Sequence, residues 1–316
     1  MPDCKSVLVY HSEDIETYKR LLGPSLPEAD FHFCQDLIEI KPLISTYEIA
    51  FVPYTFPQKL FSKMRKLKWV QVMAAGVEHF VRNAVQFNEI VVTRMVGVDA
   101  RYMAEYVLAY ILYFSQKMAK VIHAQHEKKW EFFLPEFIFK KTCGIMGLGA
   151  IGSVVAKKSK AAGLRVVSWD LYRREAPFVD KQYIAEELND FLQEADYVVV
   201  ILPVTEETAN MINRDIFRHM KTNARLINIC RGELVDEDAL CDALKQGEIA
   251  GAVIDVVKDE PLPSDNKLWD CPNLIITPHI SGVGLSEDMA VFFEENFKRY
   301  IHKEPLAGVV DFQKGF

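Results

Sequence analysis

The sequence lacks the features that mark nucleic-acid-binding, membrane and secreted proteins. Its 316 residues carry a net charge of −7 and contain no long run of lysine and arginine, which disfavours a general nucleic-acid surface. No uninterrupted apolar run approaches the length of a membrane span, and the N-terminus does not open as a signal peptide. We therefore expect a cytoplasmic protein without nucleic-acid or membrane partners.

Cysteine is sparse, and internal repeats and low-complexity segments are missing. The 6 cysteines include no C-x-x-C pair, and Cys143 and Cys230 lie in apolar, strand-like segments. Such segments usually hold buried thiols, so we expect reduced cysteines and no metal site. The chain is long enough for two domains, each with a core of its own.

Two stretches alternate between strand-like and helix-like patterns, which is typical of parallel sheets covered by helices. In the first stretch, Gly23 and Pro24 are expected to end the first helix. The strands expected there are 6–10, 31–33, 48–52, 69–73 and 90–93, and the helices are 14–22, 59–67 and 78–86. In the second stretch the strands expected are 143–146, 165–169, 197–201, 225–229, 250–255 and 274–277, and the helices are 150–162, 184–194, 213–219 and 236–246. An amphipathic helix over 286–301 follows, and the tail after it is expected to return to the first stretch.

The connection between the two stretches begins with a strongly apolar segment. Residues 100–121 contain no proline or glycine and predict one long helix, about 30 Å in length at a rise of about 1.5 Å per residue. Residues 130–139 are dense in aromatic side chains and are interrupted by Pro135. They can form a loop packed on its own domain or an arm covered by a second subunit. We favour the subunit interface, because large apolar patches are rarely left exposed.

A glycine pattern in the middle of the chain predicts a dinucleotide site. Gly147, Gly149 and Gly152 follow an apolar strand and open a helix, and a second strand ends at Asp170, 18 positions after Gly152. The first glycine allows a tight turn, the second lets the backbone approach a pyrophosphate, and the third lets helix and strand pack closely. The N–H groups at the helix start can bind phosphate, and Asp170 can accept from a ribose hydroxyl. The first stretch has no such loop, so we do not expect it to hold the nucleotide.

Three polar residues follow three successive strands of the second stretch. Arg231 comes after the strand expected at 225–229, Glu260 after the next and His279 after the last. Taken singly, each could be an ordinary surface or turn residue. Ligands of open α/β sheets bind outside the carboxyl ends of the strands, so we expect all three residues at the edge that holds the glycine loop.

The ordered set of motifs resembles the D-isomer-specific 2-hydroxyacid dehydrogenase family. The resemblance covers most of the chain and is strongest over residues 142–284. Arg94, Met95 and residues 103–106 resemble the branch of glyoxylate and hydroxypyruvate reductases; we interpret Arg94 as a strand-end surface charge rather than a second anion contact. The motifs that carry the resemblance are 147–152, 202–205, Arg231-Gly232 with 235–237, Asp255-Val256 with 260–263, and Pro278-His279 with Ser281-Gly282.

The resemblance implies two α/β domains and a homodimer. A flavodoxin-like substrate domain would comprise residues 1–98 and 286–316. A Rossmann-type NAD(P)-binding domain with a parallel sheet would be inserted into it as residues 99–285. Two hinges would join the domains, and dimers would form through the cofactor domain.

The activity that the resemblance implies is the reversible reduction of a 2-oxo acid to a D-2-hydroxy acid by hydride transfer from NAD(P)H. Arg231 would hold the carboxylate of the substrate and polarise its carbonyl. His279 would donate a proton to the carbonyl oxygen, and Glu260 would stabilise its imidazolium form. Tyr54 and Phe56 could wall the pocket for the side chain of the substrate. The implied substrate contacts are the backbone of Ala75, Gly76 and Val77 and the side chains of Arg231 and His279.

The same resemblance implies which residues bind the cofactor. Asp255 would hold the nicotinamide amide. Asp170 would repel a 2′-phosphate and accept from a 2′-hydroxyl, which favours NAD(H), whereas Arg173 and Arg174 leave NADP(H) possible. The expected cofactor contacts are Gly147, Leu148, Gly149, Ala150, Ile151, Gly152, Asp170, Leu202, Pro203, Thr208, Cys230, Asp255, His279 and Gly282.

Two alternative functions use the same fold. A formate dehydrogenase is disfavoured, because Glu260 stands where the comparison with those enzymes expects a neutral partner for the histidine. An NADH-sensing, corepressor-like binding module would keep Arg231, Glu260 and His279. The lack of long low-complexity extensions favours an enzyme over such a module.

Overall fold

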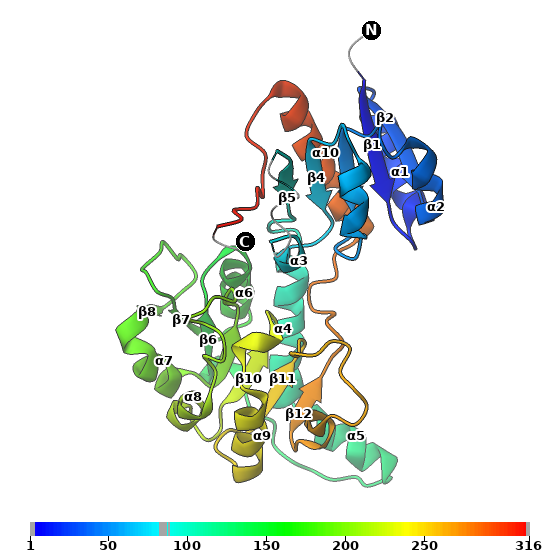
Figure 1. Cartoon of the computed structure of the whole chain (residues 1–316). Helices are drawn as coiled ribbons and strands as arrows, with labels where there is room; N and C mark the ends of the chain where they lie inside the picture. Colours follow the sequence, from blue (N-terminus) through cyan, green and yellow to red (C-terminus); the bar gives the residue numbers. More distant parts are fainter. Residues whose placement is uncertain (1–3, 82–86, 88, 314–316) are drawn as a thin grey trace. The chain divides into compact units, whose positions relative to one another are not determined.

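The computed structural model describes residues 4–81, 87 and 89–313. The chain divides into two compact units, Met1–Asp99 with Gly284–Phe316 and Ala100–Val283, so it crosses between them twice (Figure 1). Each unit is built around one parallel sheet. Within the described part of the chain, no helix is long and apolar enough to cross a membrane.

The first unit contains five parallel strands in the order β2-β1-β3-β4-β5, which is the flavodoxin order. All five predicted strands are present. They are β1 (Lys5–Tyr10), β2 (Ala29–Cys34), β3 (Ile49–Val52), β4 (Trp69–Val72) and β5 (Val91–Thr93). The helices are α1 (Ile15–Ser25), α2 (Leu37–Ile40), α3 (Glu78–Val81) and α10 (Ser286–His302), with 3-10 turns η1 (Lys41–Leu43) and η2 (Gln58–Lys63).

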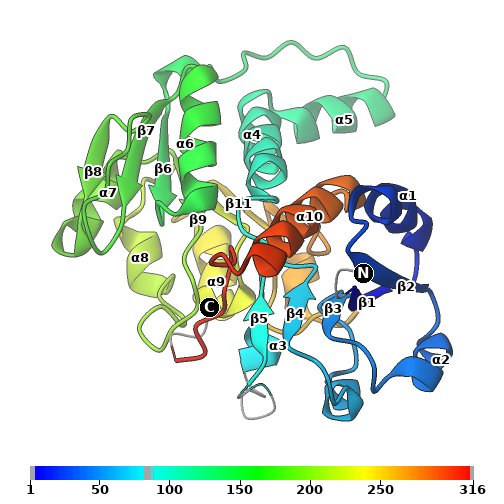
Figure 2. The same ribbon diagram turned by 90° about the horizontal axis from the view of Figure 1, so that it is seen from above.

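Aromatic side chains fill the layer between this sheet and helices α1 and α10, which run side by side (Figure 2). The ring of Phe293 in α10 stacks on Phe51 of β3 with centroids 4.4 Å apart, and on Trp69 of β4 at 5.4 Å. The tail after α10 then runs beside β5, where the N–H of Val310 donates to the carbonyl of Val92 at 2.9 Å. The predicted return of the tail to the first stretch is confirmed.

Several predictions for the first unit need correction. α1 continues through Gly23 and Pro24 to Ser25, because the fixed φ of proline, about −65°, is helical and only one backbone bond is lost near the helix end. Residues 59–67 form only the 3-10 turn η2. The helix expected over 78–86 begins as α3, and residues 82–86 lie outside the described residues. Phe56 is 1% exposed and packs on Phe61 in the core, so it cannot wall a substrate pocket.

The second unit contains seven parallel strands in the order β12-β11-β10-β9-β6-β7-β8. Counted from β6, this is the Rossmann order with one extra strand, β12, at the edge. β8 (Lys181–Tyr183) was not predicted, because a three-residue polar edge strand gives no apolar run. The other strands are β6 (Thr142–Met146), β7 (Arg165–Trp169), β9 (Tyr197–Val200), β10 (Arg225–Asn228), β11 (Gly251–Ile254) and β12 (Leu274–Ile276). The helices that follow them are α6 (Ala150–Ala161), α7 (Leu188–Glu194), α8 (Arg214–His219) and α9 (Glu237–Gln246), with 3-10 turns η5 (Ala185–Glu187), η6 (Gly232–Leu234) and η7 (Lys267–Asp270).

The segment before β6 forms two helices rather than one. α4 (Ala100–Ser115) ends before Lys117, whose left-handed φ of 53° cannot continue an α-helix, and α5 (Met118–His126) follows. The run of good helix formers gave no local signal for this break. Residues 130–139 then have no regular structure until the 3-10 turn η4 (Ile138–Lys140). Five of their large apolar side chains are exposed, namely Trp130, Phe132, Leu134, Phe137 and Phe139.

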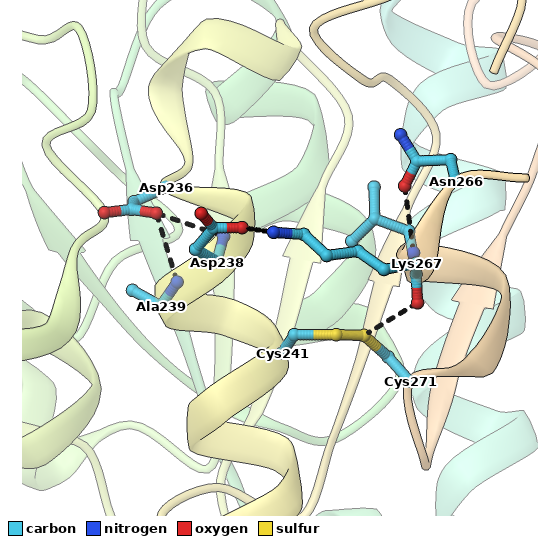
Figure 3. Close-up of a disulfide and its surroundings, with 8 residues drawn as sticks. Asp236, Asp238, Ala239, Cys241, Asn266, Lys267 and Cys271 are labelled. Carbon is cyan, nitrogen blue, oxygen red and sulfur yellow. Dashed lines mark hydrogen bonds and ion pairs between the residues drawn. A yellow bond between two sulfur atoms is a disulfide. The ribbon is translucent and has the colours of Figure 1, made fainter. Parts of the chain in front are cut away.

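Cys241 of α9 and Cys271 before β12 are joined by a disulfide, with their Cα atoms 5.6 Å apart (Figure 3). The expectation of reduced cysteines is therefore wrong for this pair, which folding brings together across 30 positions of sequence. Beside the bond, Lys267 is ion-paired with Asp238 of α9, so two links tie α9 to the segment before β12 (Figure 3). Cys143 is buried and free, and burial raises the pKa of its thiol to about 12.

Candidate active site

The loop between β6 and α6 forms a backbone cradle. Gly147 has a φ of 99°, and a Cβ there would meet the carbonyl oxygen of Ile201 at 2.3 Å, so only glycine fits. A Cβ on Gly152 would meet the carbonyl oxygen of Gly147 at 2.1 Å, which explains how closely α6 approaches the turn. At Gly149 a Cβ would meet nothing within 4 Å, and α6 begins at Ala150 without a side-chain cap. Open space beside uncapped helix N–H groups suits the pyrophosphate of a dinucleotide.

Asp170 follows β7 and is tied to this cradle. Its Oδ2 accepts the N–H of Leu148 at 3.0 Å, and its Oδ1 accepts the N–H of Leu171 at 2.8 Å. The Nε of Arg174 lies 3.2 Å from Oδ2. The acid expected at the ribose is therefore partly neutralised by one of the two arginines that could reach a 2′-phosphate.

Four further predicted cofactor contacts gather at the ends of β9 and β10. Thr208 donates from Oγ1 to the carbonyl of Pro203 at 2.7 Å, which closes the loop after β9. Cys230 donates from Sγ to the carbonyl of Leu202 at 2.8 Å, which ties the end of β10 to that loop. Leu202 also lies against the glycine turn, 3.2 Å from a Cβ placed on Gly147. The structure thus brings these residues together beside the cradle.

Arg231 lies in the turn after β10, and the conformation of this turn depends on Asn228 and Gly232. Asn228 is fully buried at the end of β10; its Nδ2 donates to the carbonyl of Arg231 at 2.9 Å. A Cβ on Gly232 would meet the backbone carbon of Val257 at 2.1 Å, so glycine lets this turn approach the segment after β11. Sequence reasoning did not single out Asn228. Its signal was an amide at the end of an otherwise apolar strand.

His279 and Glu260 meet at the same sheet edge. The Nδ1 of His279 lies 2.7 Å from the Oε2 of Glu260, and the side chains are 49% and 38% exposed. The Oε1 of Glu260 accepts the N–H of Val257 at 3.2 Å, which orients the carboxylate. With Nδ1 on the carboxylate, Nε2 is the ring nitrogen that can exchange a proton with a ligand.

Asp255 directly follows β11, is 1% exposed and bonds to the turn that carries His279. Its Oδ1 accepts the N–H of Ile280 at 2.9 Å, and its Oδ2 accepts the N–H of Ser281 at 2.8 Å. Its backbone carbonyl accepts the N–H of His279 at 2.8 Å. Asp255 therefore organises the turn that carries His279 and ends next to Gly282. The role predicted for it at the nicotinamide amide stays a prediction.

The predicted substrate loop, with Ala75, Gly76 and Val77, belongs to the first unit and follows β4. The N–H of Met95 donates to the carbonyl of Ala74 at 2.9 Å, and the Nη1 of Arg94 lies 3.5 Å from the carbonyl oxygen of Ala75. Arg94 is thus directed to this loop rather than being only a strand-end surface charge. Tyr54 is half-exposed after β3, with its ring centroid 5.8 Å from that of His79.

Hydride transfer to a 2-oxo acid requires a dinucleotide cradle, a proton donor held by a carboxylate and a cation for the substrate carboxylate. At the carboxyl ends of its strands, the second unit carries the glycine cradle, Arg231, and His279 in contact with Glu260. This combination defines an NAD(P)-dependent oxidoreductase of 2-oxo and 2-hydroxy acids. A family model described as "D-isomer specific 2-hydroxyacid dehydrogenase, NAD binding domain" matches residues 108–281, more than half of the chain. The chain belongs to the D-isomer-specific 2-hydroxyacid dehydrogenase family.

Named relatives and solved structures agree with this assignment. Glyoxylate/hydroxypyruvate reductase A of Escherichia fergusonii is 31% identical over 260 residues, which cover 80% of this chain and 83% of that protein. A family member from Aeromonas salmonicida has a similar crystal structure, with a TM-score of 0.92, 32% identity and coverage of 98% of this chain and 99% of that chain. The NADPH-dependent glyoxylate/hydroxypyruvate reductase of Sinorhizobium meliloti, solved with NADP and sulfate, has a TM-score of 0.88 and 27% identity, with 99% and 100% covered. Neither a formate dehydrogenase nor a corepressor is favoured by these comparisons.

Proposed function

We propose that this protein reduces glyoxylate, hydroxypyruvate or a similarly small 2-oxo acid to the D-2-hydroxy acid, with His279 as the proton donor. The observation that carries the proposal is the contact between His279 Nδ1 and Glu260 Oε2, 2.7 Å, at the edge that also holds the glycine cradle. The choice of substrate rests on the names of the relatives. In this proposal the first unit supplies the substrate loop and the second unit binds the cofactor.

Each of the proposed catalytic residues has a separate role in the reaction. The bound nicotinamide cofactor supplies the hydride. Arg231 holds the carboxylate of the substrate in a two-pronged contact that only a guanidinium offers. His279 gives the proton on Nε2 to the carbonyl oxygen, while Glu260 on Nδ1 stabilises the imidazolium and fixes the ring. In the reverse direction the same nitrogen takes the proton from the hydroxyl.

The test is turnover on a panel of 2-oxo acids, followed by nicotinamide absorbance. We expect activity with glyoxylate and hydroxypyruvate and a loss of about 100-fold or more in His279→Ala, since positioned acid catalysis contributes at least that much. His219→Ala is the matched control, because His219 is an exposed histidine of the same unit whose Nδ1 bonds to the carbonyl of Asp215 in α8. Unimpaired reduction by His279→Ala would contradict the assigned role, and no turnover on any member of the panel would contradict the substrate class.

We further propose a preference for NAD(H) over NADP(H). Asp170 supports it, because a carboxylate at the end of β7 favours a ribose hydroxyl over a phosphate. The relatives solved with NADP or NADPH set the competing expectation. In Asp170→Ser, Arg174 loses its acidic partner and becomes available to a 2′-phosphate, so the ratio of kcat/KM values should shift towards NADPH by about tenfold or more. A wild-type preference for NADPH that this substitution leaves unchanged would overturn the proposal.

A homodimer is proposed on the exposed arm of residues 130–139. Trp130 is fully exposed and Phe132 is 84% exposed, whereas monomeric proteins rarely display several large apolar side chains in one segment. Glu136 anchors the arm to its own unit, with Oε1 3.0 Å from Arg225 Nη2. The molar mass from light scattering should be that of a dimer and should fall to that of a monomer in Trp130→Asp with Phe132→Asp. Tyr172→Asp, at an exposed aromatic residue outside the arm, should leave the mass unchanged.

A cytoplasmic location completes the proposal and can be checked by fractionation. Disulfides are rare in that reducing compartment, so the bond between Cys241 and Cys271 makes a second check possible. Alkylation of thiols in fresh cell extract should label both cysteines if the protein resides in the cytoplasm. Protection of both would place it in an oxidising compartment.

A further inference from the structure

A chain of hydrogen bonds runs from helix α4 to the turn that carries His279. The hydroxyl oxygens of Tyr106 in α4 and Thr277 after β12 lie 2.6 Å apart. Thr277 donates its hydroxyl hydrogen to Oδ1 of Asp255 at 2.5 Å. Because that hydrogen is engaged with the carboxylate, Tyr106 must be the donor to Thr277. The direction of the chain is therefore Tyr106 to Thr277 to Asp255.

The turn at the end of this chain is one that needs support. His279 has a φ of 54°, in the left-handed region that strains a residue with a Cβ. Three acceptors of Asp255 hold the turn, since its carbonyl and its two carboxylate oxygens accept the N–H groups of His279, Ile280 and Ser281. A rotation of this carboxylate would therefore move the N–H groups of Ile280 and Ser281, the two residues that directly follow His279.

The tyrosine is suited to remain a donor at every working pH. Burial raises the pKa of Tyr106 above its ordinary value, and the nearby negative charge of Asp255 raises it further. No cation is paired with Asp255 among the interactions of the described residues, so hydroxyl and amide donors alone compensate its charge. The loss of one hydroxyl from this set weakens the restraint on the carboxylate without adding a charge.

We propose that Tyr106 is a positioning residue for the catalytic histidine, acting through the Thr277 hydroxyl and the Asp255 carboxylate on the turn at His279. The inference rests on the proposed role of His279. Tyr106 packs in the same apolar cluster as Leu148 of the cradle, but no hydrogen bond of the described residues joins its hydroxyl to the cradle or to the pair of His279 and Glu260. Its effect should therefore be on the rate of the chemical step rather than on cofactor binding. Loss of the Thr277 hydroxyl, which bonds directly to the Asp255 carboxylate, should lower the rate more than loss of the Tyr106 hydroxyl.

The experiment compares Tyr106→Phe, Thr277→Val and the double variant, all of which remove hydroxyls and keep shape. We expect kcat for 2-oxo acid reduction to fall about threefold to tenfold in Tyr106→Phe and further in Thr277→Val. KM and the cofactor Kd should stay within about twofold of the wild type. The double variant should be no slower than Thr277→Val alone, because both changes cut the same chain. Tyr113→Phe, on the same helix but outside the chain, is the matched control and should behave as the wild type.

A spectroscopic readout separates positioning from general loss of structure. The imidazole resonances of His279 in labelled protein, identified by their loss in His279→Ala, should move in Tyr106→Phe, and those of His219 should not. Wild-type kcat with unmoved His279 resonances in Tyr106→Phe would overturn the inference. So would additive losses accompanied by weaker cofactor binding and a lower Tm. If His279→Ala itself kept full activity, the proposed function would fail instead.

Discussion

The two sheets share a parallel design but place their buried polar residues differently. In the second unit, Asn228 at the end of β10 bonds to the turn that follows β10, and Asp255 just beyond β11 bonds to the turn that follows the neighbouring strand β12. Those turns carry Arg231 and His279. Buried polar side chains at strand ends can therefore be recognised as supports of a site, because their partners are the N–H and C=O groups of the loops beyond the sheet.

In the first unit, three buried polar side chains bond to each other, namely Gln71 and Thr93 of the sheet and Asn296 of α10. Thr93 of β5 accepts from the indole Nε1 of Trp69 at 2.7 Å and donates to Oε1 of Gln71 at 2.7 Å. Asn296 of α10 donates to the same Gln71 oxygen at 3.0 Å. This network joins sheet and helix and presents nothing to a ligand. The comparison predicts that substitutions in the first core act on stability and those at the strand ends of the second sheet act on catalysis.

The largest effect should come from Phe293→Ala in the first unit. Removing a fully buried ring that stacks on Phe51 and Trp69 should lower the free energy of unfolding by about 3–5 kcal/mol. The folded fraction should keep a kcat within about threefold of the wild type, because no strand-end residue of the second sheet is touched. Urea unfolding and steady-state kinetics check both values. Ile38→Ala, at a 66% exposed side chain of the same unit, should be near neutral; equal losses in the two variants would break the comparison.

Reduction of the disulfide should have the next largest effect, now on the stability of the second unit. Closing a loop of 30 residues between Cys241 and Cys271 is worth about 3–4 kcal/mol in the chain-entropy model. Urea unfolding with and without reductant measures the difference. The double substitution Cys241→Ser with Cys271→Ser should be insensitive to the reductant. Rapid alkylation of both thiols in native protein that has been purified in air, outside the reducing compartment, would contradict the bond.

A smaller free-energy effect, on catalysis, should follow from Gly232→Ala. The added Cβ meets the backbone of Val257 and Lys258 and must displace the turn of Arg231, so kcat/KM should fall about 100-fold, or about 2.7 kcal/mol. Gly149→Ala is the contrasting variant, because its Cβ enters open space. It should weaken cofactor binding and leave the Tm unchanged. A wild-type value of kcat/KM in Gly232→Ala would contradict the argument that the turn after β10 positions Arg231 for catalysis.

The smallest effect should be the pH-dependent contribution of Glu136 to the free energy of unfolding. Burial alone would raise its pKa, but hydrogen bonds and charge from Arg225 and Lys141 outweigh burial and lower the pKa below its ordinary value. A lowered folded pKa means stabilisation that is present above the unfolded value, about 4.3, and is lost as the pH falls through the folded value. Glu136→Gln should therefore cost about 1–2 kcal/mol at pH 7 and much less near pH 3. Urea unfolding at the two pH values tests the sign; an equal cost at both would contradict it.

The parts of the fold that could be predicted have a local cause. The buried strands are short apolar runs, and both sheets contain every strand expected from such runs. The edge strand β8 was missed because its polar residues pair on one side only. The break at Lys117 was missed because its left-handed backbone interrupts a sequence that contains no glycine or proline around it.

The site likewise contains residues that could be assigned from the sequence and residues whose contacts could not. Gly147 and Gly152 could be assigned from spacing, and the close backbone contacts at both positions give the reason. The present partners of Asp170 and Asp255 could not be assigned, because their hydrogen bonds reach residues 22 and 26 positions away. The contact of Tyr106, in the helix expected over 100–121, could not be predicted, because its partner Thr277 is 171 positions distant.

By itself, the sequence determined the apolar strands of both sheets, the glycine cradle and the three strand ends with Arg231, Glu260 and His279. These depend on residue type and short spacing, which local sterics and the period of the backbone turn directly into structure. Only the tertiary structure decided that Arg174 neutralises Asp170, that Cys241 meets Cys271 and that a buried carboxylate holds the turn of His279. Each of these joins groups whose proximity is created by sheet order and packing, and a linear sequence does not encode such distances locally.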